Sequence, residues 1–99
     1  MKKAFKVCRA MLKRRAMHQR KGFRMGCISL RTQLVHTEQE LIELIDVCLY
    51  GAGRPRGKKE KLDELADTVG CLILIAITLG FTEAQVERAI LKKWKMRFK

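Results

Sequence analysis

Apolar residues recur every three or four positions through most of the chain, the spacing that places them on one face of an α-helix. Four segments carry this pattern, and they predict helices over about residues 3–20, 29–50 and 59–79, with a fourth beginning at residue 82. No segment alternates apolar and polar residues as a half-buried strand would. The pattern therefore predicts an all-α protein, for which a helical bundle is the typical architecture.

Residues at the predicted helix ends support these boundaries. Thr82 fits the first position of a capping box, and Gly80 suits the position just after a helix ends. Thr37 and Glu40 fit a second capping box, which leaves open that the second helix starts later or bends there. Residues 51–57 hold three glycines and the one proline, and they predict a loop.

Each predicted helix has an apolar face that is expected to lie in the core. These faces comprise Phe5, Cys8, Leu12 and Ala16 in the first helix; Leu30, Leu34, Leu41, Leu44, Ile45 and Cys48 in the second; Leu62, Leu65, Ala66, Val69, Leu72, Ile73 and Ala76 in the third; and Val86, Ala89, Ile90 and Trp94 in the fourth. The apolar run over 69–81 is shorter than the roughly 20 residues of a membrane span. We expect it to form a helix buried on most sides, with no membrane association.

The composition narrows the class of protein further. A chain of 99 residues with 47% hydrophobic but only 6% aromatic residues predicts a single domain with an aliphatic core. Lys6 and Arg9 interrupt the first apolar stretch, so no signal peptide is expected. The four cysteines are separated by about twenty positions, without the close pairs of a zinc site. We expect reduced thiols in a cytoplasmic protein.

Charge is distributed unevenly along the chain. The net charge is +12, and residues 1–26 alone contribute +10 because they hold ten basic residues and no acidic one. Residues 27–53 carry −3 and residues 54–99 carry +5. The sequence therefore divides into a basic amphipathic N-terminal helix, residues 1–26, and a helical core, residues 27–99. The basic segment favours an anionic partner.

Two pairs of acidic residues are the strongest chemical signal. Glu40 and Glu43 are three positions apart on the second predicted helix, and Glu64 and Asp67 are three apart on the third. Residues at this spacing share one helix face, so two adjacent helices could aim four carboxylates at one point. Such a cluster needs cations, and Mg²⁺ prefers oxygen ligands. His36 lies one turn before Glu40, but as a polar helix residue it is assigned no role.

A structural explanation of the same residues stays open. Glu40 could cap the second helix, and Glu64 could pair with Lys61 or Lys59 near the start of the third. Charged pairs on helices are usually solvated surface, and the spacing alone favours this explanation.

The residues around the two acidic pairs favour a metal site over solvated surface charges. Glu40-Leu-Ile-Glu43, twenty residues and then Glu64-Leu-Ala-Asp67 resemble the ExxE…ExxD pattern of the all-α nucleoside-triphosphate pyrophosphohydrolases, the MazG-like family. The aliphatic helix that follows and the segment 91–97 also resemble this family, although its usual asparagine is absent, with Met96 nearby. The resemblance covers about residues 28–98.

The resemblance implies a specific activity and assembly. Members of the family cleave a nucleoside triphosphate between the α- and β-phosphates, giving a monophosphate and pyrophosphate. Glu40, Glu43, Glu64 and Asp67 would bind Mg²⁺, or Mn²⁺ in its place, and serve catalysis. The cations that would contact the phosphates are Lys92, Lys93 and Arg97. The family fold is a four-helix bundle completed by oligomerisation, as a homodimer or a homotetramer.

Two other functions remain possible from the sequence. The basic N-terminal helix could make the chain a nucleic-acid-binding module without catalysis, with weak sequence specificity because no recognition pattern accompanies it. The chain could also be a regulatory protein that kept the fold and lost the activity, although the presence of all four carboxylates argues against this.

Overall fold

The computed structural model describes residues 1–20, 29–50 and 57–97. These residues form the helices α1 (Lys2–Arg20), α2 (Leu30–Ile45), α3 (Lys58–Thr78) and α4 (Glu83–Arg97), and α2 continues into a π-helical turn, η1 (Asp46–Tyr50). No strand occurs in these three ranges, so the all-α prediction is confirmed. The predicted loop before Gly57 and the boundary between residues 26 and 27 lie outside the described residues.

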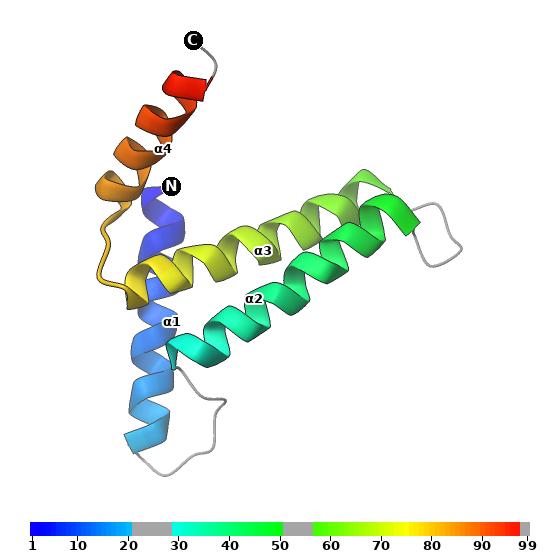
Figure 1. Cartoon of the computed structure of the whole chain (residues 1–99). Coiled ribbons are helices and arrows are strands. Elements are labelled where there is room, and N and C mark those ends of the chain that lie inside the picture. The colour runs from blue at the N-terminus through cyan, green and yellow to red at the C-terminus, as the bar shows by residue number, and fades with distance from the viewer. Residues whose placement is uncertain (21–28, 51–56, 98–99) are drawn as a thin grey trace.

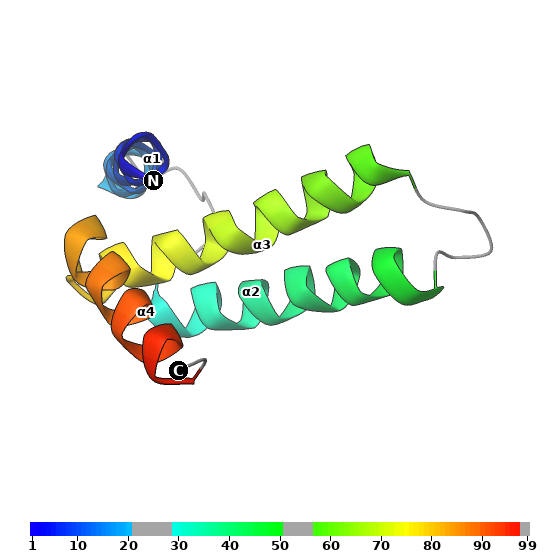
Figure 2. The same cartoon turned by 90° about the horizontal axis from the view of Figure 1, so that it is seen from above.

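Helices α2 and α3 lie side by side and run antiparallel over most of their length (Figure 1). Helix α1 crosses α3 on the side away from α2, so that α3 is the middle layer (Figure 2). The start of α2 is tied to the end of α3 by the buried Gln33, whose Nε2 donates to Thr78 Oγ1 at 2.8 Å. Helix α4 turns away from α3 by 114°.

Helix α2 begins at the earlier of its two predicted positions. The hydroxyl of Ser29 accepts a hydrogen bond from the backbone N–H of Thr32 at 3.2 Å, which caps the helix. The hydroxyl of Thr37 instead donates to the carbonyl of Gln33 at 2.7 Å, one turn back along a continuous helix. The alternative start at Thr37 is therefore wrong, because its hydroxyl serves the preceding turn and caps nothing.

The turn between α3 and α4 follows the prediction. Gly80 has φ of 87°, the left-handed conformation that commonly follows a helix end and suits glycine. The backbone N–H of Thr82 donates to Gln85 Oε1 at 2.9 Å, and the N–H of Gln85 donates to Thr82 Oγ1 at 3.2 Å. This reciprocal capping box starts α4 in a new direction.

The main apolar cluster lies where α1 crosses α3. Phe5 is 1% exposed and packs with the buried Cys8 and Ile73. Leu74, Ala76 and Ile77 of α3 and Val86 of α4 surround this cluster. Phe5 and Cys8 of the predicted apolar face of α1 thus pack the helix onto the rest of the chain, whereas the side chain of Ala16 lies outside the described part.

Many other residues of the predicted apolar faces are exposed. Leu34 of α2 is 50% exposed and Leu72 of α3 is 53% exposed. The larger hydrophobic members of the predicted core that are exposed are Leu34, Leu41, Ile45, Leu62, Leu65, Val69, Leu72, Ile90 and Trp94. The expectation that residues 69–81 are buried on most sides is wrong for the single chain. Its described helices form open layers, in which α2 packs mainly against α3 and α4 extends away from both (Figure 1).

Within the described ranges, no single helix has the length and apolarity to span a membrane. Helices α3 and α4 meet these criteria of length and composition only when taken together, across their 114° bend.

Candidate metal centre

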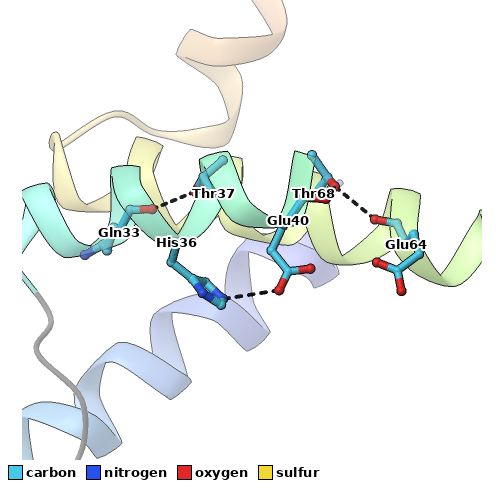
Figure 3. A network of polar contacts seen from close by, with 6 residues as sticks. All are labelled: Gln33, His36, Thr37, Glu40, Glu64 and Thr68. Carbon is cyan, nitrogen blue, oxygen red and sulfur yellow. Dashed lines mark hydrogen bonds and ion pairs between the residues drawn. The ribbon is translucent and has the colours of Figure 1, made fainter. Parts of the chain in front are cut away.

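Three of the four predicted carboxylates come together between α2 and α3. One carboxylate oxygen each from Glu40, Glu43 and Glu64 lies within 4.8 Å of the other two. Two of these residues come from one helix and the third from its antiparallel neighbour. The carboxylates of Glu40 and Glu64 are seen on the same side of the helix pair in Figure 3. A group of oxygen atoms this close can ligate one hard divalent cation.

Thr68 sets the register in which these glutamates meet. It is 6% exposed and lies between the two helices. Its hydroxyl donates to the carbonyl of Glu64 at 2.9 Å and lies 3.4 Å from the carbonyl of Glu40 (Figure 3). A small side chain that satisfies its hydroxyl locally lets the two backbones approach at this level. Sequence analysis did not identify Thr68, because threonine inside a helix carries no signal of a site.

The carboxylate of Glu40 is an enclosed part of the group. Its side chain is 15% exposed, and Oε1 lies 3.6 Å from Nε2 of His36, which is exposed. Its buried Oε2 has no hydrogen-bond partner among the described residues. Leaving a buried carboxylate oxygen without a partner is unfavourable, and a bound cation would satisfy it. His36, which received no role from the sequence, is thus part of the surroundings of this centre.

The charge around the group also suits a cation. No Lys or Arg occurs between residues 32 and 53, and the one Lys or Arg of α2, Arg31, lies nine positions before Glu40. His36–Glu40 is the one ion pair found in the described ranges. Three carboxylates at this separation repel one another, and a divalent ion would relieve the repulsion.

Asp67 is not brought into the group. Its side chain is exposed, and the close oxygen set contains the three glutamates without it. Successive residues of a helix are about 100° apart, which turns Asp67 about a quarter of a turn away from Thr68, the residue that faces α2. Asp67 lies one turn after Glu64 on α3 and outside the close oxygen group.

The predicted phosphate-binding cations lie elsewhere in the chain. Lys92, Lys93 and Arg97 are exposed on α4, which departs from the end of α3 at Thr78. Glu64 is fourteen residues before Thr78, or about 21 Å along the helix axis. The structure of one chain therefore does not bring these cations to the carboxylates.

Helix α4 carries a groove of its own. Its volume is about 430 Å³, and its lining includes Phe81, Ile90, Trp94, Lys93 and Arg97. The guanidinium of Arg97 lies over the Trp94 ring, 5.5 Å from the ring centroid. The groove is thus apolar at its centre and basic at its edge.

Comparison of the chain with protein-family models, with curated protein sequences and with solved structures found no match.

Proposed function

We propose that this protein is a Mg²⁺-dependent nucleoside-triphosphate pyrophosphohydrolase. The observation that carries the proposal is the meeting of Glu40, Glu43 and Glu64 from two helices, with a buried carboxylate oxygen of Glu40 left without a partner. The resemblance of the two acidic motifs to the MazG-like family supplies the reaction. Water is added across the phosphoanhydride between the α- and β-phosphates, and a nucleoside monophosphate and pyrophosphate are released.

Each carboxylate has a distinct place in the proposed site. Glu40 and Glu64 form its enclosed wall, and the exposed Glu43 and Asp67 form its open edge, where a triphosphate would enter. Mg²⁺ held there would offset phosphate charge and lower the pKa of a water molecule. His36, next to Glu40, restrains the orientation of that carboxylate.

The phosphate-binding cations are proposed to come from a second copy of the chain. The exposed surface of α2 after Arg31 is acidic and apolar, since it carries Leu41, Ile42 and Glu43 and no Lys or Arg. The groove of α4 is apolar and basic. These two surfaces are complementary in charge, and the described residues of the single chain cover neither of them.

A second copy of the chain would therefore complete both the proposed active site and the apolar packing. Docking α4 of one protomer along α2 of its partner would bring Lys92, Lys93 and Arg97 toward the partner's carboxylates. It would also cover exposed apolar residues of both helices, which monomeric proteins rarely display in such number. We accordingly propose a four-helix bundle completed in a homodimer or homotetramer.

Hydrolysis of a panel of nucleoside triphosphates, followed as pyrophosphate release with and without Mg²⁺, tests the proposed function. Glu43→Gln should lower the rate by roughly 10²–10³-fold, the scale seen when a group that stabilises transition-state charge is removed. Glu38→Gln is the matched control, because Glu38 is an exposed glutamate of the same helix outside the oxygen group.

Equal rates for Glu43→Gln and wild type would refute the site. Absence of hydrolysis by the wild type across the panel would refute the enzyme and favour a binding protein without catalysis.

A further inference from the structure

Helix α1 carries a straight row of cations along one side. Lys2, Lys6, Arg9 and Lys13 are spaced four, three and four positions apart, which keeps them on one helix face. All four are exposed. We call these four residues the α1 stripe.

The stripe is held in place by the packing of α1. Phe5 and Cys8 are buried against Ile73 of α3, about a quarter of a turn around the helix from the stripe. Arg9 also lies over the ring of Phe5, 5.9 Å from its centroid. The helix therefore presents its cations from a fixed support.

No acidic residue neutralises the stripe locally. Residues 1–26 contain none, and in the described ranges no cation of α1 makes an ion pair with a carboxylate. An uncompensated row of charge on a rigid helix is a surface suited to a linear polyanion.

We propose that the α1 stripe binds the phosphate backbone of a nucleic acid, independently of the chemistry at the carboxylates. The four cations span about 16 Å of helix axis, a length over which duplex DNA carries about five phosphates on each strand. One strand thus offers at least as many phosphates as the stripe has cations. The contact is to the backbone and carries no sequence preference, because side chains aligned along one helix face with phosphates read no base edges.

An anionic membrane is the competing polyanionic surface, and the packing of α1 disfavours it. An amphipathic helix binds a membrane by burying its apolar face. The apolar face of α1 already packs on α3. Among the α1 side chains that the structure describes, the large exposed apolar ones, Val7 and Met11, lie on the opposite side of the helix from the stripe, so the cations and these side chains cannot meet one flat surface together.

The salt dependence of binding to a short random-sequence DNA duplex tests the proposal with the full chain. Each phosphate contact contributes about 0.9 to the slope of log affinity against log salt, so four contacts give a slope of about −3.6. The double variant Lys6→Gln/Lys13→Gln should reduce the steepness by about 1.8. Raising the salt from about 50 to 200 mM should then weaken the wild type about 12-fold more than the variant.

The matched control removes the same charge from the same helix at another face. Lys3→Gln/Arg14→Gln lowers the net charge equally, but neither residue belongs to the stripe. The proposal predicts that this control keeps the wild-type slope and that all three proteins hydrolyse nucleotides alike.

An equal decrease in the steepness of the salt dependence in both double variants would refute the proposal, because net charge alone would then explain the binding. Unchanged binding in Lys6→Gln/Lys13→Gln, or no binding by the wild type at low salt, would also overturn it. Stronger binding of the wild type to vesicles containing anionic lipid than to DNA, lost in the same variant, would assign the surface to membranes instead.

Discussion

Replacing Glu43 with glutamine should stabilise the protein when no divalent metal is present. Glutamate and glutamine have nearly the same size and helix propensity, so the change mainly removes one negative charge. Glu43 takes part in two of the three carboxylate pairs whose oxygens lie within 4.8 Å. At that distance each pair repels by about 0.9 kcal/mol in a water-like dielectric, the limit suited to an exposed side chain. Screening at physiological salt reduces two such pairs to about 1 kcal/mol in total.

The sign of this effect should reverse in Mg²⁺. A ligand present at ten times its dissociation constant stabilises the native state by about 1.4 kcal/mol, and Glu43→Gln loses a ligating charge. In a chelator the variant should melt about 4–8 °C above the wild type, as expected for about 1 kcal/mol in a domain of this size. In saturating Mg²⁺ the wild type should equal or exceed the variant.

Thermal unfolding followed by circular dichroism, in chelator and in Mg²⁺, measures both effects. Glu38→Gln again serves as the control, because it changes the net charge equally without touching the oxygen group. If the two variants gain the same stability in chelator, the repulsion calculated from the group is absent. If Mg²⁺ shifts all three proteins alike, the group does not bind it.

Three further predictions concern the core, the fourth carboxylate and a buried thiol. Phe5→Ala should lower the free energy of unfolding in urea by about 3–5 kcal/mol because Phe5 is 1% exposed. The control Val7→Ala, at a residue that is 59% exposed, should lower it by less than about 1 kcal/mol. Similar losses in the two variants would mean that Phe5 does not anchor α1. Asp67→Asn should slow hydrolysis by at least about 10²-fold while the melting temperature in chelator holds or rises, and an undiminished rate would remove Asp67 from the site. Burial raises the pKa of the Cys8 thiol above its ordinary value of 9.0, so the folded state keeps the proton that the unfolded state releases, and stability should fall as the pH rises through about 9. Unfolding measured across this pH range should show no such loss of stability in Cys8→Ala, and a loss that persists in this variant would assign the pH dependence to other groups. In the wild type, alkylation should reach the exposed Cys48 before the buried Cys8.

The ends of the helices were predictable because residues close in the sequence determine them. Ser29, Gly80 and the Thr82–Gln85 pair each act within one turn of the backbone, so their effect can be read from neighbouring residues. Thr37 was ambiguous for the same reason, since its hydroxyl can cap a new turn or bond to the preceding one. The structure settles this choice through the carbonyl of Gln33.

The arrangement of the helices was less accessible from the sequence. Periodicity identifies an apolar face but not what covers it, and Leu34 and Leu72 are half-exposed because the single chain forms open layers. The direction of α4 depends on the turn at Gly80 and on the packing of Val86 against the α1–α3 cluster. These are tertiary choices that no local pattern encodes.

The carboxylate group was likewise predictable only in part, through the spacing within each helix and not through the packing between helices. The i, i+3 spacing placed Glu40 with Glu43, but the choice of Glu64 over Asp67 depends on how α3 is rotated against α2. Thr68 fixes that rotation through its contacts with the carbonyls of both helices. A threonine at this position became meaningful only when the two helices were seen together.

The most direct test of the proposed function is the identity of the products formed from a nucleoside triphosphate by the purified wild-type protein. Phosphorus NMR of the reaction in Mg²⁺ should show nucleoside monophosphate and pyrophosphate in equal amounts, and a chelator should abolish both. Nucleoside diphosphate with orthophosphate, or the same products at the same rate in chelator, would contradict the account.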